Sequence, residues 1–145
     1  MANPTTMSAA EREAFLAEKH VGVFSVSEAE RGPCTVPVWY IYAPGEPLRI
    51  TMGPESRKVR LLRTAGRAAL CVQQDSLPYK YVSVEGPIEI VETDVSELRR
   101  QIAERYLGSE LAPKYLASTE QYEEVLVQLR PERWWSADFS SFLLD

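Results

Sequence analysis

Short segments of strand composition, separated by turn residues, run through most of the chain. The first two cover residues 21–27 and 34–42, which are rich in β-branched and aromatic residues, and the turn sequence EAERGP between them predicts a hairpin. Residues 48–52 alternate apolar and polar side chains, and residues 67–74 have the composition of a buried strand. Strands joined by such short turns pair in antiparallel fashion, which constrains the chain to a mostly antiparallel sheet.

The second half of the chain adds further strands. Residues 80–92 predict a long alternating strand, interrupted at Gly86 and Pro87, where a bulge or bend is expected. Residues 125–131 predict a sixth strand, and residues 133–142 a seventh strand or an extended tail. The chain is therefore expected to contain six to seven strands.

Two helices are predicted in the first half. Ser8 and Glu11 have the spacing of a capping box, in which each side chain binds a free backbone amide, and they predict a helix over residues 8–19. Ser56 is a suitable cap for a short helix over residues 57–64.

A third helix is predicted between the fifth and sixth strands. Asp94 and Glu97 have the spacing of a second capping box, the helix is expected over residues 95–107, and Gly108 is expected to stop it. The following segment, LAPKYLASTEQYEE, predicts one or two short helical turns. Peripheral helices beside antiparallel strands indicate an α+β barrel and not a doubly wound sheet.

Length and composition indicate a single globular domain over residues 1–145, with residues 1–7 expected to be flexible. The chain contains no apolar run long enough to cross a membrane and its start lacks the features of a secretion signal, so a cytoplasmic location is expected. The net charge of −5 argues against nucleic acid as a partner. Cys34 and Cys71 are expected to be buried thiols, and His20 is the only histidine, which disfavours a metal site.

The stretch GPESRKVRLLR places Arg57, Lys58 and Arg60 in the first turn of a predicted helix. The positive end of the helix dipole disfavours cations there, unless an anion binds between them and the free amides. A bound phosphate is one explanation. The alternative is a solvated face whose cations pair with Glu55 or other acids. No glycine-rich nucleotide motif is present, so a nucleotide-like ligand is expected to bind in another way.

The order of VGVFSVS, TVPVWYIY, LRITMGPESRKVRLLRTAGRAALCVQ and PYKYVSVEGPIEIVE resembles that of the split β-barrel flavin and deazaflavin oxidoreductases related to pyridoxamine 5′-phosphate oxidase. The resemblance extends over about residues 10–140. It implies a homodimer with two cofactor sites at the subunit interface, each binding the deazaflavin coenzyme F420 or, alternatively, FMN. No metal ligand or catalytic side chain is implied.

The resemblance also implies roles for particular residues. The cofactor phosphate is expected at Arg57, Lys58 and Arg60. The ring is expected against the second and third strands, at Val36, Pro37, Val38, Trp39, Thr51 and Met52. The residues expected to close over the cofactor or the substrate are Gln73, Gln74, Tyr79 and Lys80. Neighbouring strand residues point to opposite sides, so only one of Trp39 and Tyr40 is expected to face inward.

The function expected from this resemblance is hydride transfer from reduced F420 to an unsaturated or quinone-like small molecule. A vitamin B6 oxidase is disfavoured, because Arg130 and Arg133 are the only basic residues near the C-terminus for a substrate phosphate. A cofactor carrier without turnover and a structural dimer without a cofactor are the alternatives. Trp134 and Trp135 are expected either to reach the partner's site or to form the core of the dimer.

Overall fold

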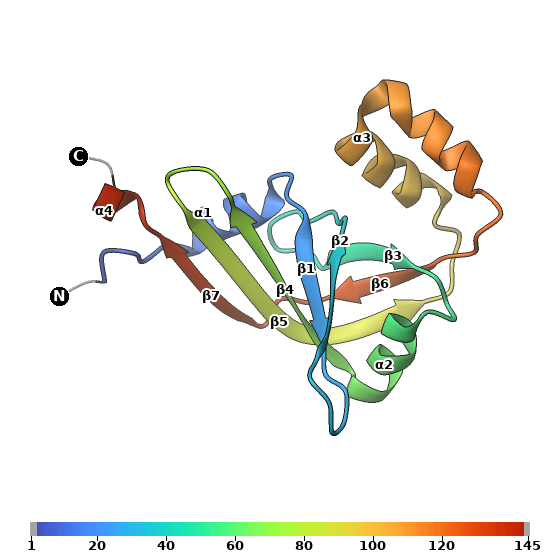
Figure 1. The fold of residues 1–145 in the computed structure, drawn as a ribbon, viewed down its shortest axis with the longest axis horizontal. Coiled ribbons are helices and arrows are strands. Elements are labelled where there is room, and N and C mark those ends of the chain that lie inside the picture. Colours follow the sequence, from blue (N-terminus) through green and yellow to red (C-terminus); the bar gives the residue numbers. More distant parts are fainter. Residues whose placement is uncertain (1–2, 144–145) are drawn as a thin grey trace.

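The computed structural model describes residues 3–143, in which seven strands form one antiparallel sheet curled into a split barrel (Figure 1). The strands are β1 (Gly22–Val26), β2 (Cys34–Val38), β3 (Leu48–Met52), β4 (Arg67–Gln74), β5 (Lys80–Val91), β6 (Val125–Leu129) and β7 (Arg133–Asp138). Their order is β2-β1-β4-β5-β6-β3, and β7 also pairs with β5. The α+β barrel predicted from the sequence is confirmed.

The long strand β5 links the two halves of the barrel because it changes partner along its length. Residues 80–87 pair with β4, and residues 88–91 pair with β6. The predicted interruption at Gly86 and Pro87 is wrong, since both residues remain in the strand. The reason for a glycine here is close approach: a Cβ on Gly86 would lie 1.8 Å from the carbonyl oxygen of Arg130.

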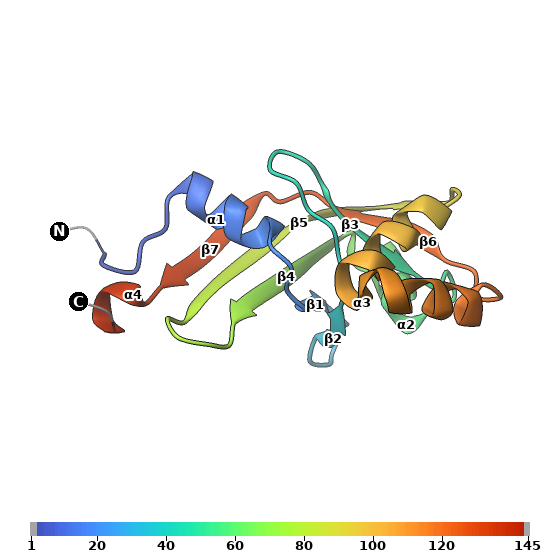
Figure 2. The same cartoon turned by 90° about the horizontal axis from the view of Figure 1, so that it is seen from above.

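Four helices flank the sheet, namely α1 (Ala9–Ala17), α2 (Arg57–Ala65), α3 (Ser96–Thr119) and α4 (Ser140–Leu143). In both views α1 and the two ends of the chain lie at one end of the sheet, and α3 lies at the other (Figures 1 and 2). The capping box of Ser8 and Glu11 and the Ser56 cap are confirmed. Gly66 ends α2 in the left-handed conformation, with φ of 71°.

The segment α3 is longer than predicted and consists of two helical pieces. Gly108 leaves the helical conformation, with φ of 84° and ψ of 167°, so the predicted stop is correct, but the chain resumes a helix immediately. The second capping box is wrong. Asp94 accepts a hydrogen bond from the Ser96 amide at 2.9 Å, and Val95 occupies the cap position without a side-chain bond.

The second strand is shorter than the predicted range 34–42. Val38 pairs with Gly22, the first residue of β1, so the residues after Val38 have no strand partner on that side. The chain bends there and pairs again only at Ile41, which forms a bridge with Arg49. The predicted seventh strand likewise ends at Asp138, because its carboxylate accepts a hydrogen bond from the Ser140 amide and begins α4.

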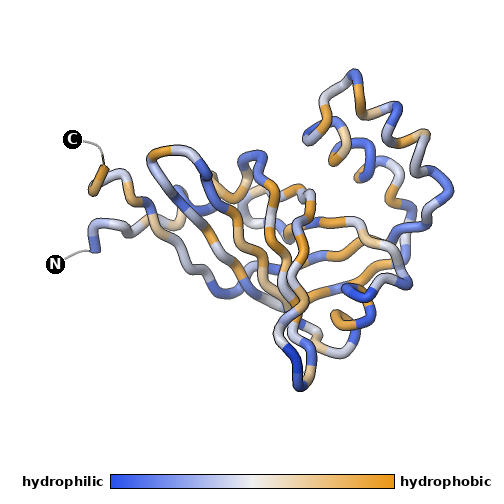
Figure 3. Tube along the Cα trace, viewed as in Figure 1, coloured by the Kyte–Doolittle hydropathy of each residue, from blue (hydrophilic) through white to orange (hydrophobic). Residues whose placement is uncertain are grey.

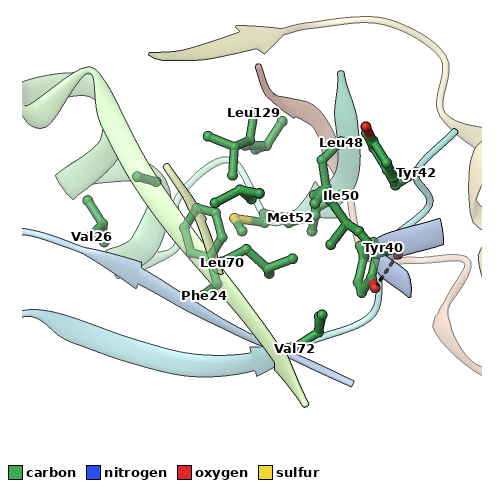
Figure 4. Packing of buried hydrophobic residues seen from close by; sticks show 14 of the residues in the cluster. Phe24, Val26, Tyr40, Tyr42, Leu48, Ile50, Met52, Leu70, Val72 and Leu129 are labelled. Carbon is green, nitrogen blue, oxygen red and sulfur yellow. Dashed lines mark hydrogen bonds between the residues drawn. The ribbon is translucent and has the colours of Figure 1, made fainter. Parts of the chain in front are cut away.

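The hydrophobic core fills the barrel interior, and hydrophobic residues are concentrated along the strands (Figure 3). Figure 4 shows Phe24, Leu70 and Met52 packed against one another from three different strands. Burying each such side chain stabilises the fold by about 1.5–3 kcal/mol. Cys34 is buried as predicted, whereas the prediction for Cys71 is wrong, since it is exposed on the outer face of β4.

Two buried tyrosines attach α1 to the barrel. The Tyr40 hydroxyl donates to the carbonyl oxygen of Leu16 at 2.7 Å (Figure 4), and the Tyr42 hydroxyl donates to the Glu13 carboxylate at 2.9 Å. Burial, and then the bond to Glu13, raise the pKa of Tyr42 to about 12 from its ordinary 10.0. Tyr42 therefore stabilises the fold fully below pH 10, and this contribution is lost as the pH rises towards 12.

We expect the Tyr42→Phe variant to show a smaller decrease in the free energy of unfolding between pH 10 and 12 than the unaltered protein, because the phenol that ionises more easily in the unfolded chain is gone. Urea unfolding at several pH values measures this. Tyr122→Phe is the control, since Tyr122 is 65% exposed. Equal pH profiles for Tyr42→Phe and the unaltered protein would contradict the assignment.

The beginning of the described chain lies along β7 and α4. The Asp138 amide donates to the carbonyl oxygen of Thr5 at 2.9 Å, the Ser141 hydroxyl donates to that of Pro4 at 2.9 Å, and Met7 is buried. Residues 1 and 2, part of the segment predicted to be flexible, lie outside the described residues. No helix within residues 3–143 is both long and apolar enough to span a bilayer.

Candidate functional site

A cavity of about 370 Å³ lies between the ends of β2 and β3 and the segment α3. Its size falls within the range of small-molecule sites. Six of the residues predicted to bind the cofactor line it, namely Pro37, Val38, Trp39, Thr51, Met52 and Lys58. Its walls combine apolar and polar surface, with Lys58 and Arg99 as the cations and Glu124 as the acid among the described residues that line it.

Trp39 reaches the cavity because its neighbour turns inward. Tyr40 is fully buried, and successive residues of an extended chain point to opposite sides. The prediction that only one of the two faces inward is confirmed. The indole of Trp39 stacks on the ring of Tyr106, with 5.2 Å between centroids and 5° between planes, and the ring of Tyr115 lies 5.7 Å away at 52°.

Lys58 comes to the cavity from the first turn of α2. Val59 and Leu62 bury the opposite side of this helix in the core, while the side chain of Lys58 is half-buried at the cavity. No ion pair holds the ammonium among the salt bridges of residues 3–143. A cation beside a helix N-terminus, at the edge of a cavity, is suited to bind an anionic group.

The other two predicted cations of this turn lie elsewhere. Arg57 forms an ion pair with Glu28, in the turn between β1 and β2, and Arg60 donates to the backbone carbonyl of Glu55 at 2.8 Å. Neither lines the cavity. The structure therefore supports the alternative of a solvated, paired face for Arg57 and Arg60, and brings only Lys58 together with the ring-binding residues.

The residues predicted to close over the cofactor also lie away from the cavity within one chain. Gln74 donates to the carbonyl oxygen of Pro78 at 2.7 Å, Lys80 pairs with Asp138 at 3.8 Å, and Gln73 and Tyr79 are exposed. All four lie at the β4–β5 hairpin, which is at the α1 end of the sheet, whereas α3 is at the other end (Figures 1 and 2). Val36, on β2, packs against the core and also lies outside the cavity lining.

The structure adds site residues that the sequence did not reveal. Ile102 and Tyr115 come from the two helical pieces of α3 and form the wall facing β2 and β3. Arg99 lies one turn before Ile102, and its Nε is 2.7 Å from the Glu124 carboxylate while Nη2 donates to the Thr119 hydroxyl at 2.6 Å. Helical spacing predicted the first piece of α3, but no local signal shows which part of the barrel it faces.

A second cavity of about 460 Å³ adjoins the first, since Gly53, Arg99, Tyr115 and Glu124 line both. Its lining also includes Ser56, the cap of α2, and the acids Glu55 and Glu123. The ion pair of Arg99 with Glu124 thus lines both the cavity that carries Lys58 and the cavity that carries Glu55 and Glu123.

Other candidate groups are engaged away from the cavity. His20 Nε2 lies 3.0 Å from the carbonyl oxygen of Phe15, and no group of three metal-binding side chains occurs within residues 3–143. Trp134 packs within the chain, beneath the guanidinium of Arg12 at 4.9 Å, while Trp135 is 52% exposed.

Comparison with known proteins gives one family and a set of similar folds. The family model described as pyridoxamine 5′-phosphate oxidase matches residues 8–138. No sequence among the curated proteins matches the chain.

Many solved structures share the fold, among them the following three. A conserved hypothetical protein from Mycobacterium tuberculosis is 24% identical with a TM-score of 0.75, and the match covers 100% of this chain and 93% of that chain. A protein described as an F420 reductase is 23% identical with a TM-score of 0.71, over 85% of this chain and 94% of that chain. A FAD-binding protein from Mesorhizobium loti is 20% identical with a TM-score of 0.69, over 91% and 93% of the two chains.

Proposed function

The chain belongs to the pyridoxamine 5′-phosphate oxidase family, and on this basis we propose that it is an oxidoreductase that uses reduced coenzyme F420 to reduce an unsaturated or quinone-like small molecule. The family supports binding of a flavin-type cofactor. FMN is the alternative cofactor. F420 is preferred because a protein described as an F420 reductase shares the fold over 85% of this chain.

One observation carries the proposal: a single cavity brings together apolar ring-binding walls and one cation at a helix start. Pro37, Val38 and Trp39 supply the walls on one side. Lys58 lies in the first turn of α2, so that a phosphate bound to its ammonium would also contact the positive end of this helix. These residues fit a flat heteroaromatic ring that carries a phosphate. Reduced F420, when bound, supplies a hydride, while the protein positions the ring, holds the phosphate and limits access of water.

Lys58 is the proposed phosphate ligand of this chain. Arg57 would first have to leave Glu28, and Arg60 lies against the Glu55 carbonyl. Thr51 offers a hydroxyl beside Met52 at the end of β3, where polar groups of a ring are expected to lie. No proton donor is required of Tyr79 or Lys80, which belong to the β4–β5 hairpin at the opposite end of the sheet from α3 (Figure 1).

Titration with F420 and FMN, followed by assay with a panel of enones and quinones, tests this function. We expect one of the two cofactors to bind tightly, and its reduced form to be oxidised by a panel member with a saturable rate. Binding without oxidation would instead indicate a carrier. If neither cofactor binds, the proposed function is wrong.

We further propose that two chains form a homodimer through the outer face of the sheet. Val23, Cys71, Ser83 and Trp135 lie side by side across β1, β4, β5 and β7. Val23 and Trp135 are 47% and 52% exposed, and Tyr81 lies on the same face of β5. Isolated exposed apolar residues are ordinary, but an aligned row favours an interface. In such a dimer, we propose that the β4–β5 hairpin of one chain reaches the cavity of the other.

We expect the Trp135→Glu variant to be monomeric, because a carboxylate buried in an apolar interface loses its hydration without a partner. Sedimentation or size-exclusion chromatography with light scattering measures the mass of the particle. Phe142→Glu is the matched control, since Phe142 is also exposed but lies on α4, away from this row. A dimer that survives Trp135→Glu would place the interface elsewhere.

A further inference from the structure

Trp39 lies where the chain leaves the sheet, so the strand pairing does not fix its side chain. Val38 is the last residue of β2 that pairs with β1. The backbone of the next two residues is held from the other side, because Tyr40 is buried and its hydroxyl donates to the carbonyl oxygen of Leu16 at 2.7 Å. The position of the Trp39 backbone is thus determined, but the plane of its indole depends on what packs against it.

The ring of Tyr106 is the surface on which that indole rests. The two rings are almost parallel, at 5°, with centroids 5.2 Å apart, which is an attractive arrangement for an offset aromatic pair. Tyr115 touches the indole only in a tilted orientation, at 52°. The plane of the Trp39 indole therefore follows that of Tyr106.

Tyr106 is itself held firmly by backbone groups from two other segments. Its hydroxyl donates to the carbonyl oxygen of His20 at 2.6 Å and accepts from the Tyr40 amide at 3.2 Å. Next to it in the helix, Arg105 donates to the carbonyl oxygen of Ala17 at 2.8 Å, and its guanidinium lies 5.8 Å from the Tyr106 ring centroid. A hydroxyl bound at one end and a cation near the face leave the ring little freedom to rotate.

We propose that Tyr106 is a positioning residue that fixes the indole of Trp39 as a rigid wall of the cavity and thereby sets its affinity for flat heteroaromatic rings. The identity of the ring as a flavin or deazaflavin rests on the proposed function; the positioning of Trp39 does not. Tyr106 does not line the cavity and acts only through Trp39.

The first test measures binding of ring compounds with and without a phosphate. In Tyr106→Leu we expect the affinities for FMN and for riboflavin, which lacks the phosphate, to fall together by about three- to tenfold, because the lost stack weakens a wall that both rings contact. Tyr106→Phe retains the stacking ring but loses the hydroxyl bonds to His20 and Tyr40, so we expect both affinities to fall by less than in Tyr106→Leu. Leu111→Ala, on the exposed side of α3, is the matched control.

The second test follows Trp39 in the protein without cofactor. The chain has three tryptophans, so Trp134→Phe with Trp135→Phe leaves Trp39 as the only indole. In this background the fluorescence anisotropy decay of Trp39 is expected to gain a fast local component with Tyr106→Leu, a smaller one with Tyr106→Phe, and none with Leu111→Ala. A loss of fold stability alone would not produce this difference while the protein remains folded.

The outcomes separate the two proposals. If Trp39 stays rigid in Tyr106→Leu, or if ring affinity is unchanged in that variant while the unaltered protein binds riboflavin, the positioning role is overturned. Where the unaltered protein binds no flavin or deazaflavin, only the proposed function fails, and the anisotropy measurement still decides the role of Tyr106.

Discussion

Replacing Lys58 by glutamine is expected to weaken binding of phosphate-bearing cofactors by about 10- to 100-fold, because hydrogen bonds to charged groups contribute roughly 1.5–3 kcal/mol. Binding of the phosphate-free rings, riboflavin and the corresponding deazaflavin, is expected to change by less than about twofold. Titration of the four compounds by absorbance or fluorescence measures both effects. The difference between paired compounds isolates the phosphate contact from any general change in the cavity.

Two matched variants sharpen this prediction. Arg63→Gln removes an exposed cation from the last turn of the same helix and is expected to leave all four affinities unchanged. Arg57→Gln is expected to have a much smaller effect than Lys58→Gln, because Arg57 is paired with Glu28. An equal loss for riboflavin and FMN in Lys58→Gln, or a larger loss in Arg57→Gln, would show that the phosphate is bound by other groups.

Replacing Gly86 by alanine is expected to destabilise the fold by about 3–5 kcal/mol, at the upper end for a single substitution. The added Cβ would lie 1.8 Å from the carbonyl oxygen of Arg130 and 3.3 Å from the amide nitrogen of Glu132. This backbone cannot easily move, because the Arg130 amide donates to the Pro87 carbonyl at 3.1 Å and the Glu132 amide donates to that of Glu85 at 2.9 Å.

Urea unfolding of Gly86→Ala measures this loss, with circular dichroism to establish whether the variant folds at all. Gly32→Ala is the control, since no atom lies within 4 Å of a Cβ at that position, and its effect is expected to stay within about 0.5 kcal/mol. A decrease in the free energy of unfolding below about 1 kcal/mol in Gly86→Ala would mean that the backbone between β6 and β7 can shift to accommodate the added Cβ. Because this connection crosses the strand that links both halves of the barrel, we expect a folded variant to lose cofactor affinity as well.

Much of the secondary structure follows from signals that act over a few residues. The bounds of β3 and β4 agree with the predicted ranges 48–52 and 67–74, because turn residues flank both strands and their side chains follow the expected pattern. The cap formed by Ser8 and Glu11 depends only on groups three residues apart. The capping box predicted for Asp94 and Glu97 is also a local signal, but it was wrong. The Asp94 carboxylate accepts a hydrogen bond from the amide of Ser96, two residues on, and this bond competes with the capping arrangement.

The candidate site was predicted only in part, and there is a physical reason why some of its residues could be predicted and others could not. Lys58 and Arg57 are adjacent on a helix and therefore point in different directions, so the way α2 packs decides which one reaches the cavity. Sequence pattern alone gave both cations the same role. Likewise, the residues of the β4–β5 hairpin belong to no cavity within one chain, and their predicted role stays a prediction that depends on the proposed dimer.

The sequence by itself determined the kind of fold, because alternation, turn residues and helix caps are local properties that together permit a small, mostly antiparallel barrel with peripheral helices. Only the tertiary structure decided the composition of the cavity. Its walls join residues far apart along the chain, from Pro37 to Tyr115 and Glu124, and their meeting depends on how α3 docks through Tyr106 and Arg105 onto backbone groups near residues 17–20 and 40. Such long-range contacts are set by packing of the whole domain, which no short stretch of sequence encodes.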